Sequence, residues 1–429
     1  MDAKLREESL DELKKKKSYS YKEMTYKNKT QRLEVYEIPV EYLVFNQYNG
    51  RIGTFVKTYE KQYGPIDSST PDGENIIVDF LWNSKKNRNL ETYNDIKEKG
   101  QLEYGIVTKD GVVIDGNRRC MILKKIASDF NTTPTYFKAV ILDDTLDDNP
   151  KEIRKLETIY QMGVDEKVDY NAIEKYLKCQ DLFIEGFTHN EIGKMMGENG
   201  SKIKEYLEIL ELMEDYLKTY NYEGMYTILN EETVEGPFVD LRRYLESQRT
   251  GNWIHDRDWS PEADDIDDLK LIYYDYIRAG LRAAQGIRTI GNPAKGQGFF
   301  NHKKIWEEFL NRHYSEIGPI NKDEPTLEEL REECRGDKVD NIILARNNDW
   351  SHKVSGLMKK NMGLTQRSLE DHNESNSPSE LLSRAYKTLE AVDTNVEVFY
   401  TEDIKKQCHE IRKIAEHFID IIKNREKYE

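Results

Sequence analysis

One short segment of the sequence combines a tight turn with two adjacent arginines. Asp115 and Gly116 follow a short apolar run, and Asn117, Arg118 and Arg119 begin a stretch of helical character. A glycine lets the backbone approach a ligand, free N–H groups at a helix start attract an anion, and guanidinium groups bind phosphate. Ordinary solvated arginines are the alternative, although two cations at the positive end of a helix oppose its dipole. We therefore predict a phosphate site at this turn.

The region around that turn alternates between strand and helix patterns. Asp110 and Gly111 are flanked by apolar residues and are expected to supply the positive φ angles of a two-residue hairpin turn. Helix-like stretches separate the β-prone runs, which lie at residues 34–38, 76–80, 106–114 and 136–142. This alternation predicts a mixed α/β domain over residues 34–150, and an acidic run ending in proline marks its edge.

A second pattern, from residue 187 to residue 210, predicts two helices separated by a tight break. Thr188 and Glu191 have the spacing of a capping box, Gly197 and Gly200 allow the turn, and Ser201 can cap the next helix. This arrangement is typical of a DNA-binding helix-turn-helix, whose second helix enters the major groove.

The residues expected to contact DNA lie at the starts of those two helices. In the second helix they face the major groove and are Ser201, Lys202 and Lys204. In the first helix they hold backbone phosphates and are His189, Asn190 and Lys194. A plain helical hairpin is the alternative, because the second helix also carries Glu205 and Glu208.

Three segments resemble motifs of the ParB/sulfiredoxin superfamily in order and spacing. Gly116, Arg118 and Arg119 match the G-E-R-R-x-R-A box of ParB proteins. Residues 46–51 resemble the N-P-x-x-P-R box, which ends in an arginine near the nucleotide. Residues 157–161 fall where ParB proteins have E-N-x-x-R.

The resemblance implies a pocket for a nucleoside triphosphate, CTP or ATP, with Mg²⁺ near Glu157. Met121 and Gln161 replace two motif arginines, which predicts weaker phosphate binding or a different ligand. Asn117 occupies the position of the catalytic cysteine of sulfiredoxins, so reductase activity is not expected. The implied nucleotide-binding residues are Arg51, Asp115, Gly116, Asn117, Arg118 and Arg119.

Composition limits the function classes. A chain of 429 residues is expected to divide into several domains, and its net charge of −16 confines DNA binding to one local module. Four separated cysteines predict neither a disulfide framework nor a cysteine zinc site. The charged start and the lack of a long apolar run favour a cytoplasmic protein without a membrane partner.

The end of the sequence predicts an amphipathic helix that needs a partner. Its apolar residues alternate in steps of four and three, at Ile404, Cys408, Ile411, Ala415, Phe418 and Ile422. A helix over residues 379–392 could cover them within the chain. A second copy, giving a homodimer, or another protein subunit is the alternative.

Together these patterns predict an α+β chain: a ParB/sulfiredoxin-like N-terminal domain, a helix-turn-helix domain and an all-α C-terminal region. The expected order is a charged arm (1–33), the nucleotide domain (34–150), the DNA-binding domain (151–220), a helical domain (221–320), and linkers with a helical hairpin (321–429). The implied role is nucleotide-controlled binding of double-stranded DNA in partition, a phage or a mobile element, with nucleotide hydrolysis left open. The alternatives are a metal-dependent DNA nuclease using Glu157 and Asp115, and a non-catalytic scaffold with a vestigial pocket.

Overall fold

The computed structural model describes most of the chain and divides it into two compact units, residues 1–362 and 363–429. The sequence-predicted boundaries near residues 33, 150, 220 and 320 all lie inside the first unit. The fold class is α+β, as expected, with one six-stranded sheet and many helices. The described residues are 2–130, 135–164, 171–231, 234–251, 258–281, 287–294, 297–375 and 378–425.

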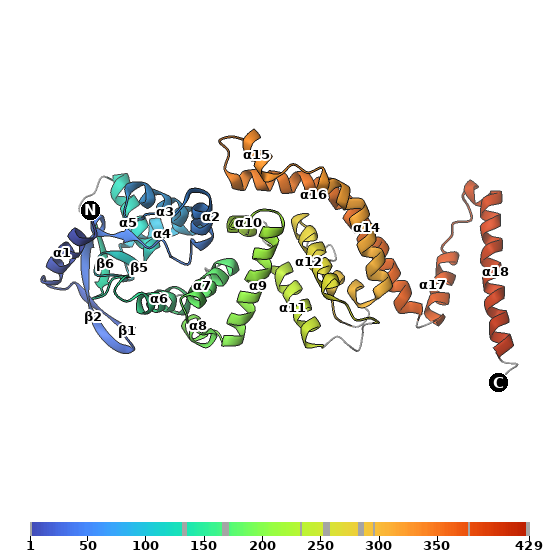
Figure 1. Cartoon of the computed structure of the whole chain (residues 1–429), viewed down its shortest axis with the longest axis horizontal. Coiled ribbons are helices and arrows are strands. Elements are labelled where there is room, and N and C mark those ends of the chain that lie inside the picture. Colours follow the sequence, from blue (N-terminus) through green and yellow to red (C-terminus); the bar gives the residue numbers. More distant parts are fainter. Residues whose placement is uncertain are drawn as a thin grey trace. The chain divides into compact units, whose positions relative to one another are not determined.

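The sheet belongs to the N-terminal part of the first unit (Figure 1) and has the strand order β1-β2-β6-β4-β5-β3. The pairs β1–β2, β2–β6 and β4–β5 are antiparallel, whereas β4–β6 and β3–β5 are parallel. The sheet therefore contains both parallel and antiparallel pairs. The strands are β1 (Ser20–Tyr26), β2 (Lys29–Pro39), β3 (Val44–Phe45), β4 (Gly105–Val107), β5 (Val112–Asp115) and β6 (Tyr136–Ile141).

Helices cover both faces of this sheet. Phe137 and Ile141 of β6 point to one face, where they share a core with Ile77 and Met121 from the helices that connect the strands. Val140 points to the opposite face, whose core includes residues of α6. This alternation is what the two-residue period of a strand requires. The helices of this part are α1 (Ala3–Lys14), α2 (Gly53–Tyr63), α3 (Pro71–Ser84), α4 (Lys86–Lys99), α5 (Asn117–Phe130) and α6 (Pro150–Thr158), followed by the π-helical turn η2 (Ile159–Val164).

The expected charged arm over residues 1–33 is wrong. This segment forms α1, β1 and the start of β2, and Leu10 of α1 is fully buried. Lys27 and Asn28 have φ angles of 50° and 59°, so they form the turn of a two-residue hairpin in which Tyr26 pairs with Lys29. The segment resembles a solvated arm in sequence because β1 is an edge strand with few buried side chains.

The β-prone run at residues 76–80 is also not a strand. It lies in α3, whose N-cap Thr70 accepts a hydrogen bond from Gly73 and whose first residue is Pro71. Ile77 and Leu81, one helical turn apart, are buried on the same face. A threonine cap followed by proline is a helix start, so the local β propensity is overridden by capping and packing.

The structure confirms the predicted strands at residues 34–38 and 136–142 and the predicted hairpin at residues 106–114. The turn of this hairpin differs from the expected one. Gly111 has a φ of 86°, whereas Asp110 does not have a positive φ angle. Val107 pairs with Val113, so the connection is longer than two residues. Thr108 stabilises it by accepting a hydrogen bond from Val112 N–H.

The helices that follow the sheet include the predicted helix-turn-helix elements, α7 (Ala172–Ile184), α8 (His189–Met196) and α9 (Gly200–Thr219), which contact one another pairwise. The capping box of Thr188 and Glu191 is present, and Gly197 has a left-handed conformation that ends α8. Gly193 lies so close to the α9 turn that an added Cβ would be 2.7 Å from the carbonyl oxygen of Glu198. The N-cap of α9 is Asn199, two residues before the expected Ser201.

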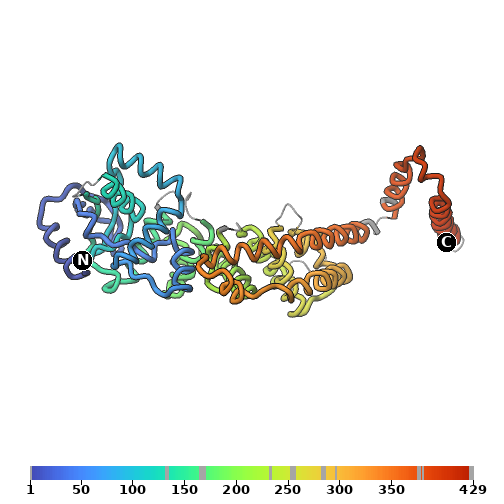
Figure 2. The backbone as a smooth tube through the Cα atoms, turned by 90° about the horizontal axis from the view of Figure 1, so that it is seen from above, coloured from blue at the N-terminus to red at the C-terminus, as the bar shows by residue number. Residues whose placement is uncertain are grey.

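Further helices complete the first unit, green to orange in Figure 2. A buried ion pair joins Arg278 of α12 to Glu324 in the loop after α14, and Arg278 also donates to Asn347 of α16. They are α10 (Tyr226–Glu231), α11 (Glu235–Thr250), α12 (Ala263–Arg278), α13 (Arg288–Gly291), α14 (Lys303–Lys322), α15 (Leu327–Glu333) and α16 (Val339–Ser375). Part of the region expected to hold linkers, residues 321–429, is instead one continuous helix, α16, from Val339 to Ser375.

The second unit contains the end of α16, α17 (Pro378–Glu390) and α18 (Glu402–Arg425). The predicted C-terminal helix is confirmed, and its apolar residues Ile411, Phe418 and Ile422 are 41–58% exposed. None of the helices in the described part of the chain combines the length and the apolar composition needed to cross a membrane.

Candidate functional site

A pocket of about 370 Å³ opens at the turn between β5 and α5. Four arginines line it, from three separate segments: Arg51 from the loop after β3, Arg88 from α4, and Arg118 and Arg119 from α5. Asp115 supplies a carboxylate. The remaining lining residues are Asn49, Thr92, Gly116, Asn117 and Gln161. The structure thus brings together all six residues that the sequence predicts for this pocket.

Gly116 is required by the shape of the turn. Its φ is 95°, and an added Cβ would lie 2.8 Å from the ring of Phe137. The guanidinium of Arg119 packs beside this glycine and donates a 3.0 Å hydrogen bond to Asp115 Oδ2. Asp115 therefore fixes the position of Arg119, one helical turn later.

Asn117 has a structural role that the sequence did not predict. Its side-chain oxygen accepts a hydrogen bond from Asn46 N–H at 3.1 Å, and its amide nitrogen donates to the carbonyl oxygen of Val113 at 2.7 Å. Both polar atoms of this buried side chain are thus used inside the fold. Asn117 therefore positions the loop after β3 against the turn.

The loop after β3 holds Arg51 through local hydrogen bonds. Asn49 accepts the N–H of Arg51 on its side-chain oxygen at 3.0 Å, which forms an Asx turn. Tyr48 of the same loop packs against the guanidinium of Arg154, 4.0 Å from the ring centre. These contacts fix the loop between the pocket and α6.

Arg88 is a pocket residue that the sequence analysis missed. It lies on α4, about 30 positions before the motif that carries Arg118. The adjacent Asn89 is fully buried and donates to the carbonyl oxygens of Leu81 and Trp82 at the end of α3. The sequence around Arg88 is polar and carries no motif, so only the tertiary fold shows that α4 reaches the pocket.

Glu157, predicted as the catalytic and metal-binding residue, lies outside this pocket lining and is fully buried. Its Oε1 accepts from Asn46 Nδ2 at 3.0 Å, and its Oε2 pairs with Lys178 Nζ at 2.8 Å. Arg154 approaches Oε2 at 3.5 Å. The carboxylate is therefore neutralised inside the fold by two cations, and a metal ion would have to displace them.

The pocket residues do not fit a Mg²⁺ ion. Mg²⁺ at nucleotide sites is bound by one or two carboxylates together with phosphate oxygens and water. Asp115 is the carboxylate in the described lining, and it is held by Arg119 and lies 3.9 Å from Lys22 Nζ. The surroundings of both Asp115 and Glu157 are cationic, so the metal expected from the resemblance has no suitable ligands here.

Cys120 lies near the pocket but is not a reactive thiol. It is fully buried, and burial raises the pKa of its thiol to about 12. Nucleophilic cysteines are partly exposed and have a lowered pKa. This environment is unsuited to the chemistry of a sulfiredoxin.

A second buried carboxylate holds the helix that follows the Arg51 loop. Glu174 of α7 accepts hydrogen bonds from the backbone N–H of Thr54, at 3.3 Å, and from its hydroxyl, at 2.6 Å. Gly53 permits this approach, since an added Cβ would lie 2.9 Å from Glu174 Oε2. Burial raises the pKa of Glu174 to about 7, although the hydrogen bonds from Thr54 oppose the shift.

The residues predicted to contact DNA lie at the surface of α8 and α9. Asn190, Lys194 and Ser201 are exposed, and the ring of His189 stacks on Phe183. Two lysines of α9 pair with glutamates of the same helix: Lys202 with Glu205 at 2.7 Å, and Lys204 with Glu208 at 3.7 Å. The expected basic face is therefore partly neutralised.

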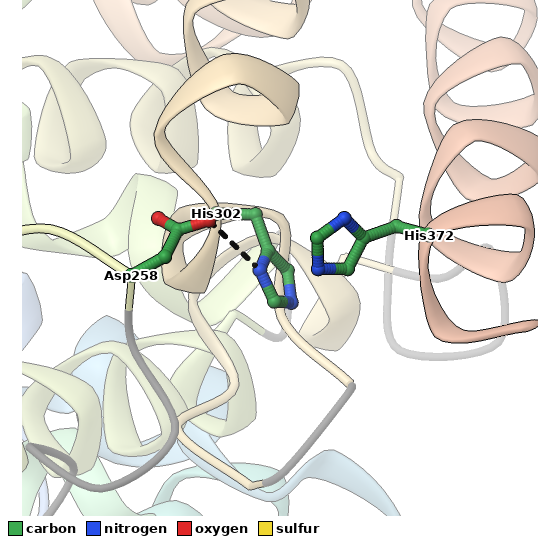
Figure 3. Close-up of side chains that lie close together, drawn as sticks. All are labelled: Asp258, His302 and His372. Atoms are coloured by element: carbon green, nitrogen blue, oxygen red, sulfur yellow. Dashed lines mark hydrogen bonds and ion pairs between the residues drawn. The ribbon is translucent and has the colours of Figure 1, made fainter. Parts of the chain in front are cut away.

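Asp258 and His302 form another polar group, in the helical part of the first unit (Figure 3). His302 Nδ1 lies 3.3 Å from Asp258 Oδ2, and Asp258 Oδ1 accepts the N–H of Lys303 at 2.9 Å. Because Lys303 is the first residue of α14, this carboxylate caps the helix from a distant segment. The position of Asp258 beside His302 is therefore explained by its role at the start of α14.

We predict that replacing Glu174 with glutamine changes the pH dependence of stability. A carboxyl whose pKa is raised from 4.5 to about 7 on folding lowers the free energy of unfolding as pH rises through this interval. The free energy of unfolding of Glu174→Gln, relative to that of the wild type, should therefore rise by about 3 kcal/mol between pH 4.5 and pH 7.5. Urea unfolding at both pH values measures this difference. The exposed Glu41→Gln is the control, and an equal effect of Glu174→Gln at both pH values would contradict the prediction.

A scan against protein-family models and a search of curated proteins find no match for this chain. The case for a function therefore depends on the geometry of the arginine-lined pocket and of helices α7 to α9.

Proposed function

We propose that this chain is a ParB-like protein that binds a nucleoside triphosphate, CTP or ATP, in the arginine-lined pocket and double-stranded DNA through α8 and α9. One observation carries the proposal: four guanidiniums from three segments line one pocket that contains a single carboxylate among its described residues. In a chain with a net charge of −16, this local gathering of arginines favours an anionic ligand.

A phosphate group matches this pocket in charge and in hydrogen-bond geometry. Arg118 and Arg119 lie in the first turn of α5, where the helix dipole already favours an anion. Guanidinium groups donate paired hydrogen bonds that suit phosphate oxygens. A ligand that binds only the folded chain should also stabilise the fold.

The proposal for DNA rests on the three-helix arrangement and on the exposed start of α9. The ion pairs of Lys202 and Lys204 lie at the surface, where such pairs contribute at most about 1 kcal/mol. DNA phosphates can therefore compete for these lysines. The acidic chain predicts modest affinity with a strong dependence on salt concentration.

The pocket and the DNA-binding helices are joined by buried polar contacts. The loop after β3 carries Arg51, and Asn46 in the same loop donates to Glu157, which pairs with Lys178 of α7. Immediately after this loop, Thr54 donates to Glu174, also on α7. Because α7 contacts both α8 and α9, a ligand that moves the loop also moves the DNA-binding helices. We propose that nucleotide binding controls DNA affinity by this route.

The proposed nuclease activity is less consistent with the geometry. Metal-dependent cleavage requires carboxylates that are free to bind metal, whereas Asp115 and Glu157 are each paired with cations. A non-catalytic scaffold agrees with the exposed C-terminal helices but gives no reason for the convergence of four arginines.

The C-terminal helices are proposed to pair with a second copy of the chain. Besides the predicted seam, Ile414, Ile419 and Ile421 of α18 are 50–55% exposed, so its apolar face is wider than one narrow helix contact can cover. Leu382, Tyr386 and Leu389 of α17 are also exposed. A second α17–α18 pair supplies matching surfaces by twofold symmetry.

For the pocket, we predict that Arg118→Ala combined with Arg119→Ala weakens nucleotide binding. Each lost hydrogen bond to a charged phosphate contributes about 1.5–3 kcal/mol, so the dissociation constant should rise at least tenfold. Isothermal titration with CTP and with ATP measures the change. Arg249→Ala, an exposed arginine on α11, serves as the matched control. Unchanged affinity in the double variant would show that nucleotide binds elsewhere.

For DNA, we expect Lys202→Glu combined with Lys204→Glu to weaken duplex binding at least tenfold, because phosphate contacts are replaced by repulsion. Fluorescence anisotropy of labelled duplex, with and without CTP, measures affinity and its control by nucleotide. The matched control is Lys359→Glu with Lys360→Glu, which makes the same charge change on exposed residues of α16. If both double variants bind duplex equally well, α9 does not contact DNA.

For self-association, we predict that Ile411→Asp combined with Phe418→Asp converts a dimer to a monomer, because charge cannot be buried in an apolar interface. Sedimentation equilibrium of the full chain measures the mass. Lys413→Asp, on another side of α18, should leave the dimer intact. A monomeric wild-type chain would exclude the proposed pairing.

A further inference from the structure

A second cavity, of about 210 Å³, is lined by the loop after β3 and by residues of α2, α6 and α7. No described residue lines both this cavity and the arginine-lined pocket. Val56, Leu177 and Leu182 give it buried apolar walls, and Tyr48 and Ile184 add exposed apolar surface. Cavities for drug-sized ligands measure about 300–1,000 Å³, so this one suits a smaller molecule with an apolar part.

Glu174 contributes a buried carboxylate to this lining. It is 4% exposed, and it accepts hydrogen bonds from Thr54 and from the backbone N–H of Gly53. No described lysine, arginine or histidine forms an ion pair with it. Gly53 also lines the cavity, and the position that its Cβ would take lies 2.9 Å from Glu174 Oε2. Because an isolated buried carboxylate is costly in its charged form, a cation that reaches Glu174 is favoured.

The other charged side chains of the lining are matched, with one exception. Its three cations each pair with a carboxylate, and one of these carboxylates lies outside the lining. Glu60 accepts the N–H of Ile66 at 3.2 Å and, like Glu174, has no described cation as its partner. These two carboxylates give the cavity a surplus of negative charge, which favours a cationic ligand. The matched pairs are Lys57–Asp181 at 2.8 Å, Arg154–Glu185 at 3.2 Å and Lys178–Glu157 at 2.8 Å.

Apolar walls beside a carboxylate match an ammonium group on an alkyl chain. An ammonium group is a compact charge with three N–H donors, and its chain can pack on apolar side chains. A calcium ion needs about six to eight oxygen ligands, which walls of valine and leucine cannot supply.

We infer that this cavity binds a primary alkylammonium group, whose N–H groups donate to Glu174 while its chain packs on the apolar walls. The ammonium group belongs either to a free amine or to a lysine side chain of another protein. The site is independent of the proposed nucleotide and DNA binding.

A ligand-observed NMR titration of the full chain compares butylammonium, ethylammonium and 1-butanol. Butylammonium should bind at least about tenfold more tightly than 1-butanol, which has the same chain without the charge. It should also bind at least about tenfold more tightly than ethylammonium, since each buried CH₂ group strengthens binding by about fourfold. Equal binding of 1-butanol would overturn recognition of the charge, and equal binding of ethylammonium would overturn the role of the apolar walls.

A variant connects this binding to the buried carboxylate. Glu174→Gln keeps the shape of the side chain but removes its charge, so it should weaken butylammonium binding at least about tenfold. Glu41→Gln, the same change at an exposed position, is the matched control. Circular dichroism verifies that both variants are folded. An unchanged affinity of Glu174→Gln would overturn the site.

The pH dependence of wild-type binding is a second test that needs no variant. Burial, and to a smaller extent the charge of Asp181, raises the pKa of Glu174 to about 7, so its ionised fraction rises from about a tenth at pH 6 to about nine-tenths at pH 8. An alkylammonium group has a pKa near that of lysine, about 10.4, and stays charged in this interval. The dissociation constant should therefore fall about tenfold from pH 6 to pH 8. A constant value would contradict the pairing with Glu174.

Nα-acetyl-lysine methylamide distinguishes the two sources of the ammonium group, because it carries the same butylammonium chain on a peptide backbone. Tighter binding than that of butylammonium supports a lysine of another protein as the occupant. Weaker binding supports a free amine. If neither compound binds, the cavity is not an ammonium site and the inference is wrong.

Discussion

The buried ion pair between Glu157 and Lys178 is the interaction on which the arrangement of the first unit depends. Glu157 is fully buried and Lys178 nearly so, and the carboxylate also accepts a hydrogen bond from Asn46 in the loop that carries Arg51. Removing Glu157 would leave the charge of Lys178 in the interior without this counter-ion, at a cost of about 3–5 kcal/mol. The pair therefore holds three segments in one geometry: the pocket loop, α6 and α7.

This constraint explains why the arginines of the pocket can stay close together. Arg51 is placed by a loop that Asn117 and Glu157 hold from two sides, and Arg119 is placed by Asp115. The positions of these arginines are thus set by hydrogen bonds behind them, inside the fold.

The sequence predicted the elements that depend on local chemistry. The capping box at Thr188, the left-handed Gly197 and the turn at Gly116 were identified because each uses residues with a specific backbone or capping role. It failed where tertiary packing decides: the first 33 residues form an edge of the sheet, and residues 76–80 are helical. In the site, all six predicted residues line the pocket, but Asn117 makes hydrogen bonds inside the fold, Glu157 is turned inward and Arg88 comes from α4.

One physical explanation accounts both for the inward orientation of Glu157 and for the presence of Arg88 in the pocket lining. Gln161 and Met121 stand where the resembled motifs have arginines, and Met121 is buried in the apolar core. With fewer arginines on η2 and α5, the positive charge of the pocket is restored from α4 by Arg88. Glu157 meanwhile faces Lys178 and Arg154, so it serves as an internal counter-ion. A site that takes its charge from arginines on several elements needs such a counter-ion network behind it, because the same segments must be held in place without the ligand.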